Sequence, residues 1–319
     1  MKTIGILTSG GDAPGMNAAI RAVARTAFAN GIRVKGIRNG YDGLIKGDIY
    51  EMNVSSVADI VHKGGTILGS ARSEEFPTPE GQEKALNVIK EYGIEGIVVI
   101  GGDGSFIGAN RLHRRGINVI GIPGTIDNDM GFTDETIGFN TAIETVIDAI
   151  GKLRDTSSSH GRSNIVEVMG RRCGDLALHA GVCGGAESIL VPEIPTDIEQ
   201  VIERVERGRK RGKLHHIIVV AEGCGNSYDI AKLIEERTGV ETRVTVLGHV
   251  QRGGTPAARD ILLANKTGTR AVELLMEGKS SLAIGLKDGK IYEMPIDEAV
   301  NVKNEFDTEL YTIASILSN

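Results

Sequence analysis

Short apolar runs alternate with amphipathic stretches along this chain of 319 residues. Runs rich in β-branched residues predict strands at 3–8, 96–100, 118–122, 164–169 and 215–221. Each run is continuously apolar, as expected of a strand that is buried on both faces of a sheet. Segments with the helical spacing of apolar residues separate them, at 18–28, 81–92 and 141–153. This alternation predicts right-handed βαβ units and a parallel sheet.

Glycine and polar residues follow each predicted strand at once. The five loops read SGGD, GGDGS, PGTIDND, GRRCGD and EGCG. In open α/β sheets, ligands bind beyond the carboxyl ends of the strands. We therefore expect one ligand cleft to gather these loops. The chain length fits two domains or one large α/β unit.

Glycine is unusually frequent: the 43 glycines are nearly twice the usual share of about 7%. The pairs in SGGD and GGDGS can turn successive N–H groups inward to bind an anion, and a helix that we expect to begin near Pro14 adds positive potential. An ordinary turn would explain a single pair. Two loops that each carry an aspartate favour phosphate with a cation between them. Since Mg²⁺ takes one or two carboxylates plus phosphate oxygens, Asp103 is the expected ligand.

The PGTIDND loop offers candidates for acid–base chemistry. Asp127 and Asp129 lie two residues apart, close to the Thr125 hydroxyl. A base that accepts a hydroxyl proton during phosphoryl transfer is typically aspartate. An Asx-rich turn is the plain structural alternative for this segment.

Arginine is concentrated in the following part of the chain, at Arg154, Arg162, Arg171, Arg172, Arg243 and Arg252. Guanidinium forks match phosphate, so a doubly phosphorylated product would use several of them. Arg21 and Arg25 lie one helical turn apart, and a dense basic cluster spans residues 207–213. These two sets form either solvated faces or a second anion site.

Composition narrows the class of protein. Apolar residues make up 40% of the chain, so a sizeable core can form, and the net charge of −6 argues against nucleic acid as the main partner. We expect neither a transmembrane helix nor a signal peptide. The three cysteines, Cys173, Cys183 and Cys224, form no CxxC pair and suggest reduced thiols in a cytoplasm.

Together the motifs resemble the bacterial ATP-dependent 6-phosphofructokinase family. The resemblance runs from Lys2 nearly to the C-terminus and includes LTSGGDAPGMNAAIR, GTILGSAR, VVIGGDGS, PGTIDND, EVMGRRCGD, GGAE, VVAEG and ETRVTVLGHVQRGG. GGDG alone would be weak, because lipid and NAD kinases carry similar loops. The chain has no GxxxxGK[ST] P-loop and no complete GxGxxG.

The resemblance implies an α/β fold of two similar-sized three-layer α/β/α domains with largely parallel sheets. An ATP-binding domain would comprise residues 1–138 and 251–301, and a sugar-phosphate-binding domain residues 139–250 and 302–319. It also implies transfer of the ATP γ-phosphoryl group, with Mg²⁺, to the 1-hydroxyl of fructose 6-phosphate in glycolysis. A homotetramer controlled by ADP and phosphoenolpyruvate is implied as well.

The resemblance also assigns roles. Asp127 would be the base, supported by Thr125 and Asp129, while Arg72 and Arg171 would neutralise the moving phosphoryl group. ATP would be held by Gly11, Arg72, Ser73, Gly102, Asp103, Gly104 and Ser105, with Asp103 on Mg²⁺. Fructose 6-phosphate would be held by Thr125, Ile126, Asp127, Met169, Gly170, Arg171, Glu222, His249, Val250, Gln251 and Arg252, and by Arg162 and Arg243 of a neighbouring subunit. The effector would be held by Arg21, Arg25, Arg154, Gly185, Ala186, Glu187, Arg211, Lys213, Leu214 and His215.

Three departures from the family pattern bear on function. Pro77 and Gln82 stand where many relatives have basic residues near the nucleotide, and Gly161 stands where Glu or Gln is usual. The nearest alternative is a pyrophosphate-dependent phosphofructokinase, whose pattern has aspartate at Gly104 and lysine at Gly124. A lipid or NAD kinase would rest on GGDGS alone. A nucleotide sensor without catalysis is opposed by the retained aspartates and arginines.

Overall fold

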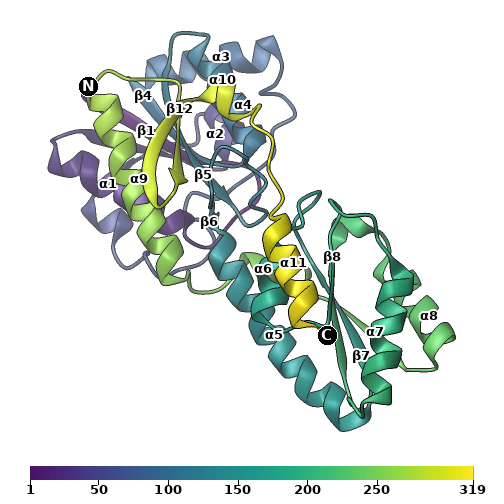
Figure 1. The fold of residues 1–319 in the computed structure, drawn as a ribbon. Helices are drawn as coiled ribbons and strands as arrows, with labels where there is room; N and C mark the ends of the chain where they lie inside the picture. The colour runs from purple at the N-terminus through teal and green to yellow at the C-terminus, as the bar shows by residue number, and fades with distance from the viewer. Residues whose placement is uncertain (319) are drawn as a thin grey trace. The chain divides into compact units, whose positions relative to one another are not determined.

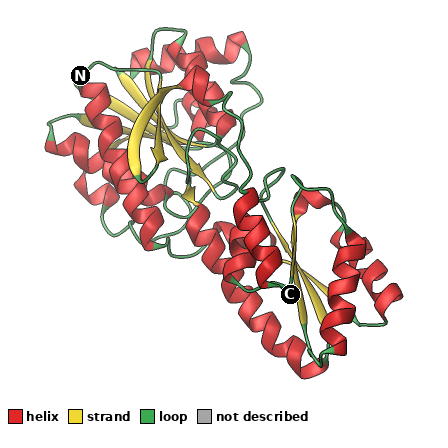
Figure 2. Cartoon of the chain, viewed as in Figure 1, coloured by secondary structure: helices red, strands yellow, loops and turns green. Residues whose placement is uncertain are grey.

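The computed structural model describes residues 1–318 and divides the chain into two compact units. The first unit comprises Met1–Thr125, Met130–Thr141 and Arg252–Asn304. The second comprises Ile126–Asp129, Ala142–Gln251 and the chain from Glu305 onward. Each unit has its own largely parallel sheet with helices on both faces (Figures 1 and 2). The predicted fold class, with two α/β domains, is confirmed.

The sheet of the first unit has the strand order β12-β11-β5-β4-β1-β2-β3, and β6 pairs with β5. Its strands are β1 (Thr3–Thr8), β2 (Arg33–Ile37), β3 (Ile49–Met52), β4 (Gly96–Gly101), β5 (Asn118–Thr125), β6 (Ile137–Gly138), β11 (Leu282–Lys287) and β12 (Lys290–Pro295). The central strands run parallel, while β3 and β12 join the edges antiparallel. The carboxyl ends of β1, β4 and β5 therefore share one edge of the sheet.

Helices cover both faces of this sheet. Two of them, α1 (Met16–Ala29) and α9 (Ala258–Met276), pack together on one face. The other face carries α2 (Gly40–Lys46), α3 (Pro79–Glu91), α4 (Asp103–His113) and the short α10 (Ile296–Ala299). Apolar side chains of these four helices form one core with β1, β2, β4 and β5. The 3₁₀ helix η1 (Val54–Val57) follows β3.

The second unit has a parallel sheet of order β10-β7-β9-β8. Its strands are β7 (Ser163–Val168), β8 (Ser188–Leu190), β9 (His216–Ala221) and β10 (Thr242–Val246). One face packs against α7 (Ile198–Lys210) and α8 (Ser227–Thr238). The other carries α5 (Phe139–His160), α6 (Asp175–Cys183) and α11 (Thr308–Leu317) (Figure 1). Two 3₁₀ helices, η2 (Glu222–Cys224) and η3 (Gly248–Arg252), follow β9 and β10.

The five strands predicted from apolar runs correspond to β1, β4, β5, β7 and β9. The helix expected near Pro14 is α1, which begins at Met16, so Pro14 itself is not its first residue. Gly15 caps this helix at φ 105°, a backbone conformation that favours glycine. A methyl group there would also lie 2.6 Å from Cγ2 of Ile137. Pro14 therefore belongs to the turn before the helix.

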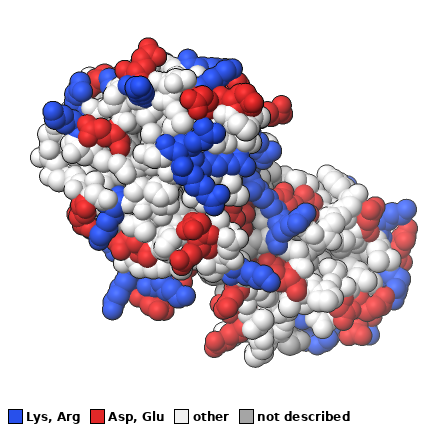
Figure 3. All heavy atoms as spheres, turned by 90° about the horizontal axis from the view of Figure 1, so that it is seen from above, with Lys and Arg blue, Asp and Glu red and all other residues white. Residues whose placement is uncertain are grey.

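The structure also shows how the charged residues are distributed and whether any helix could cross a membrane. Acidic and basic side chains are interspersed on the face shown in Figure 3. Within residues 1–318, no helix combines the length and the apolar character needed to cross a membrane.

Candidate active site

In the first unit, the two glycine loops lie against each other at the carboxyl ends of β1 and β4. The Ser9 N–H donates to the Ile100 carbonyl at 3.0 Å, and the Ser105 hydroxyl donates back to the Ser9 carbonyl at 3.0 Å. Tyr41 Oη donates to the Ser105 carbonyl at 2.6 Å from the buried side. These bonds hold both loops in one place, as the shared sheet edge requires.

The GGDGS loop opens directly into α4. Gly102 is the N-cap, and Asp103 lies in the first turn, where the helix dipole favours a carboxylate. Gly104 is exposed, and a methyl group added there would meet no atom within 4 Å. The helix N-terminus thus offers N–H groups and open space beside an acidic side chain, a combination that suits phosphate with a cation.

A third loop reaches the same place. Asn17 of α1 donates to the carbonyls of Lys63 and Gly64, each at 3.1 Å, and accepts from the Ile67 N–H at 2.7 Å. Further along this loop, the Ser70 hydroxyl donates to the Gly10 carbonyl at 2.5 Å. Arg72 and Ser73 follow within three residues, so their backbone is tethered beside SGGD.

Arg252 also lies at the SGGD loop. A methyl group added to Gly11 would lie 3.3 Å from the Arg252 Cζ atom. Sequence reasoning placed Gly11 with ATP and Arg252 with the sugar phosphate. The structure brings the two together within the first unit, so one cation faces the backbone of the first glycine loop.

In the second unit, Asp127 and Arg171 form an ion pair. Arg171 Nε lies 3.2 Å from Asp127 Oδ2, and its Nη1 lies 4.0 Å from Asp129 Oδ2. The Asp127 side chain is only 3% exposed, whereas that of Arg171 is 53% exposed. Burial raises the pKa of Asp129, although Arg171 opposes the shift. The arginine thus faces a buried carboxylate with one side and solvent with the other.

Unusual backbone conformations fix this pair. Arg171 has φ 55° and Asn128 has φ 52°, both in the left-handed region that few non-glycine residues occupy. The Arg171 N–H donates to Glu222 Oε1 at 2.8 Å, and the Asn128 amide donates to Asp175 Oδ2 at 3.0 Å. Gly170, at φ 132°, has no space for a side chain, since a methyl group would lie 2.4 Å from the Cys173 carbonyl oxygen.

The neighbouring sugar-phosphate candidates differ in exposure. The Met169 N–H donates to Oε1 of the buried Gln251 at 3.3 Å, which links the end of β7 to η3. His249 and Val250 are exposed, whereas the Ile126 side chain is buried in the core. Ile126 can therefore offer a ligand its backbone only. Burial raises the pKa of the Cys173 thiol to about 12, which makes it unreactive.

Arg162 and Arg243 do not join this group. Arg162 immediately precedes β7 and Arg243 is the second residue of β10, so both lie at the amino edge of the sheet. Arg171 follows the carboxyl end of β7. Six strand residues lie between, which span about 20 Å at roughly 3.3 Å per residue. Both arginines bind Glu241 instead.

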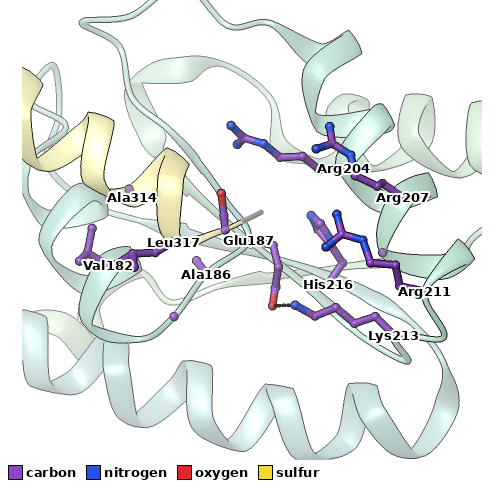
Figure 4. Close-up of a pocket in the computed structure, with 13 residues that line it drawn as sticks. Val182, Ala186, Glu187, Arg204, Arg207, Arg211, Lys213, His216, Ala314 and Leu317 are labelled. Carbon is purple, nitrogen blue, oxygen red and sulfur yellow. Dashed lines mark ion pairs between the residues drawn. The ribbon is translucent and has the colours of Figure 1, made fainter.

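Several effector candidates of the second unit surround a cavity of about 270 Å³ (Figure 4). Arg204, Arg207 and Arg211 line it from α7, and Ala314 and Leu317 line it from α11. At its base, Lys213 Nζ lies 2.5 Å from Glu187 Oε1. Burial acts to raise the pKa of Glu187, but hydrogen bonds from Lys213 and the Ile217 N–H outweigh it and lower this pKa.

The remaining effector candidates do not line this cavity. Arg154 donates to the carbonyls of Gly184 and Gly185, at 2.5 and 2.9 Å. His215 lies 2.8 Å from the Ser158 hydroxyl, and Leu214 is 61% exposed. Arg21 and Arg25 belong to α1 of the first unit, where neither is buried.

Arg207 belongs to the basic cluster for which the sequence left open a solvated face or a second anion site, but the sequence did not single out Arg204, His216 or any residue of α11. A signal existed for the arginines: positions 204, 207 and 211 recur at helical spacing and so share a face of α7. No such signal existed for α11, because only tertiary folding brings residues 308–317 beside residues 182–187.

The departures from the family pattern have structural correlates. Gln82 donates to the Pro77 carbonyl at 3.2 Å and so braces the loop before α3. Gly161 ends α5 at φ 66°. A methyl group at Gly124 would lie 3.1 Å from Ile100 Cγ2 and 3.3 Å from Met16 Cε, which points it into the core. Packing thus accounts for Gly124, and of the two glycines only Gly104 faces open space.

This chain is similar in sequence to proteins of known family over its whole length. A family model described as phosphofructokinase matches residues 3–275. Among curated proteins, the ATP-dependent 6-phosphofructokinase of Finegoldia magna is 67% identical over 318 residues, and that of Alkaliphilus metalliredigens 60%; each alignment covers 100% of both chains.

Solved structures show the same fold. The phosphofructokinase of Saccharomyces cerevisiae matches with a TM-score of 0.91 at 35% identity, over 98% of this chain and 50% of that one. A pyrophosphate-dependent phosphofructokinase of Marinobacter aquaeolei matches with a TM-score of 0.87 at 25% identity, over 97% of this chain and 86% of that one.

Proposed function

Because this chain belongs to the phosphofructokinase family, as an ATP-dependent 6-phosphofructokinase, we propose that it transfers the γ-phosphoryl group of ATP to the 1-hydroxyl of fructose 6-phosphate. The products are fructose 1,6-bisphosphate and ADP. The chain acts in glycolysis and in the cytoplasm, where its three free cysteines stay reduced.

The observation that carries this proposal is the pairing of buried Asp127 with half-exposed Arg171. Asp127 accepts the proton of the sugar hydroxyl as that oxygen attacks the γ-phosphorus. Arg171 holds the carboxylate in place and turns its remaining N–H groups to the phosphoryl oxygens, whose charge it offsets. Thr125 and Asp129 support this arrangement from the same loop.

The glycine loops of the first unit bind the nucleotide. Gly11 and the segment Gly102–Ser105 present backbone to the phosphates, and Arg72 with Ser73 approaches on its tethered loop. Gly104 leaves the space that a nucleoside diphosphate group needs. Mg²⁺ would sit on Asp103 and offset phosphate charge, and it would take its other ligands from ATP and water, as this ion commonly does. Within residues 1–318, no three acidic, histidine or cysteine side chains gather to bind a metal without such ligands.

The PGTIDND loop supports a division of labour between domains. Thr125 ends β5 of the unit that holds the glycine loops, and Ile126–Asp129 belong to the unit that holds Arg171. We assign ATP to a domain of residues 1–138 and 251–301 and the sugar phosphate to one of residues 139–250 and 302–319.

The sugar phosphate is bound by residues that follow the strands of the second unit: Met169, Gly170, Glu222, His249, Val250, Gln251 and Arg252. Arg162 and Arg243 lie at the amino edge, about 20 Å from Arg171 by strand length. They therefore serve the 6-phosphate site of a neighbouring copy, which makes a homo-oligomer necessary. We propose a homotetramer.

An anionic effector, ADP or phosphoenolpyruvate, occupies the cavity between α7 and α11. Arg154, Arg211 and Lys213 supply its positive charge, and Gly185, Ala186 and Glu187 form its floor. Leu214 and His215 follow Lys213 in the sequence and do not line the cavity. Arg21 and Arg25 complete the site from another subunit.

The Asp127→Asn variant tests the catalytic assignment. It keeps the size of the side chain but removes its ability to take a proton, so we expect kcat to fall by about 10²–10⁴-fold. Binding of fructose 6-phosphate, measured by calorimetry, should survive. Asp229→Asn, an exposed aspartate on α8, is the matched control and should keep normal kcat. Near-normal kcat in Asp127→Asn would show that another group is the base.

A further inference from the structure

Three charged side chains meet at the amino edge of the second sheet. Glu241 accepts from Arg162 Nε at 2.5 Å through Oε2, and its Oε1 pairs with Arg243 Nη2. One carboxylate thus bridges the two arginines that the proposed function gives to the 6-phosphate. Sequence reasoning assigned no role to Glu241.

The backbone register builds this trio. In the parallel pairing of β7 with β10, Ser163 lies opposite Thr242 and Asn164 opposite Arg243. The Ser163 N–H also donates to the Glu241 carbonyl at 3.0 Å, which sets Glu241 directly across from Arg162. Glu241 and Arg243 are two residues apart in extended chain, so their side chains share a face. The contact is therefore a consequence of the strands.

The trio remains open to a ligand. The Arg162, Glu241 and Arg243 side chains are 33%, 38% and 63% exposed. A hollow of about 250 Å³ lies beside them, lined in part by Gly161, Arg162 and Glu241. Hydrogen bonds from Arg162 and Arg243 lower the pKa of Glu241, so the carboxylate is charged at neutral pH.

A carboxylate at this place could either compete with phosphate for the arginines or hold them in position. The number of N–H donors that it occupies distinguishes these two roles. A stand-in anion would occupy the donors that phosphate needs, and phosphate would have to expel it. An arginine has five N–H groups, and the contacts to Glu241 use the single Nε donor of Arg162 and one Nη2 donor of Arg243. Most donors of both forks stay available, so phosphate can bind while Glu241 remains.

We propose that Glu241 is a positioning residue, which orders Arg162 and Arg243 side by side so that their remaining donors converge on one phosphate group. This inference rests on the proposed function, which gives both arginines to the 6-phosphate. Long flexible side chains lose rotamer freedom when they bind a ligand, and ordering them beforehand lowers that penalty. The ligand class is a sugar phosphate whose phosphate is a dianion.

The test uses steady-state kinetics of the full-length enzyme and its Glu241→Gln variant. We expect the KM for fructose 6-phosphate to rise roughly three- to tenfold, the range set by ordering one or two long side chains. The KM for ATP and kcat at saturating sugar phosphate should stay within about twofold, and the melting temperature should not change. A merely structural residue would not produce this selective shift.

The matched control is Glu199→Gln. Glu199 is also an exposed glutamate of the second unit paired with an arginine, since it accepts from Arg237 at 2.8 and 2.9 Å. This variant should leave both KM values unchanged. In an Arg243→Ala background, Glu241→Gln should raise the KM for fructose 6-phosphate less than it does alone, because half of the ordered pair is already gone.

The outcomes separate this inference from the function beneath it. Suppose that the wild-type enzyme turns over fructose 6-phosphate and that Arg243→Ala raises the KM for this substrate. If Glu241→Gln then leaves the KM for fructose 6-phosphate unchanged, the positioning role of Glu241 is wrong. If Glu241→Gln lowers that KM, Glu241 is a competing anion and the proposal is overturned. If Arg243→Ala does not change the KM for fructose 6-phosphate, the 6-phosphate assignment fails and this inference fails with it. Absence of any turnover of fructose 6-phosphate would overturn the proposed function itself.

Discussion

At the scale of single residues, two glycines bear on the choice of phosphoryl donor. Gly104 and Gly124 both stand where the pyrophosphate-dependent pattern has charged side chains. The structure separates them: Gly104 borders open space, whereas Gly124 packs against Ile100 and Met16. The proposed structural basis of the preference for ATP is therefore Gly104 alone, because packing explains Gly124 whatever the donor is.

His216 gives the residue-scale prediction. Burial lowers its pKa to about 4, although Glu187 opposes this shift while Lys213, Arg204 and His215 reinforce it. Between pH 6.5 and pH 4, His216 is protonated in the unfolded chain but stays neutral in the folded chain. The free energy of unfolding should therefore fall as the pH drops through this window, by on the order of 2–3 kcal/mol at its lower end.

The measurement is urea unfolding of wild type and His216→Gln at several pH values. The glutamine cannot titrate, so the difference in stability between the two proteins should shrink steadily from pH 6.5 to pH 4. A difference that stays constant across this window would mean that His216 is protonated in the folded state.

At the scale of elements, the end of α5 shows how a departure from the family pattern can have a local cause. Gly161 follows His160, the last helical residue, at φ 66°, and the Arg162 N–H returns to the Ser157 carbonyl at 3.2 Å. This is the usual geometry of a glycine that ends a helix. The added methyl group would meet no atom within 4 Å, so the conformation alone favours glycine here.

Replacing Gly161 tests this cap. Gly161→Ala should lower stability by about 1 kcal/mol, because an L-residue is strained in the left-handed region. Gly161→Asn should lose less, since asparagine tolerates that region. Melting temperatures of the three proteins check the order. Equal stability of the alanine variant and wild type would show that the helix end rearranges without loss.

Much of the fold could be predicted because the central strands are buried on both faces and are therefore visible in the sequence as apolar runs. Every residue of β1 and β4, for example, is buried. The edge and short strands gave no such signal. In β12 every residue is half-buried or exposed, and β8 has only three residues. Candidate site residues could be proposed where loops follow strands, as at Asp103 and Asp127, and their roles stay predictions. Glu241 and Arg204 could not be proposed in this way, because pairing register and helix docking create their contacts.

At the scale of the whole molecule, the proposed sugar-phosphate site needs residues from more than one copy of the chain. Arg243 and Arg171 lie at opposite edges of one sheet, so a single second unit cannot bring both to the same sugar phosphate. Mixing inactive Asp127→Asn protein with Arg243→Ala protein, by dissociation and reassociation, should restore part of the activity. Some sites would then combine an intact base from one copy with an intact arginine from the next.

Hybrid formation must be verified independently, for example with differently tagged subunits. Reassociated Asp127→Asn protein alone is the control and should stay inactive. Verified hybrids without recovered activity would place the base and the arginine in one subunit's site, and would contradict the strand geometry.

Product analysis with two phosphoryl donors tests the proposed transfer reaction. The enzyme is incubated with fructose 6-phosphate and either MgATP or magnesium pyrophosphate, and products are followed by phosphorus NMR. We predict one new phosphate ester, at carbon 1 of the sugar, formed with an equal amount of ADP, and little product from pyrophosphate. ADP release without a sugar bisphosphate, or equal product from both donors, would show that the proposed reaction is wrong.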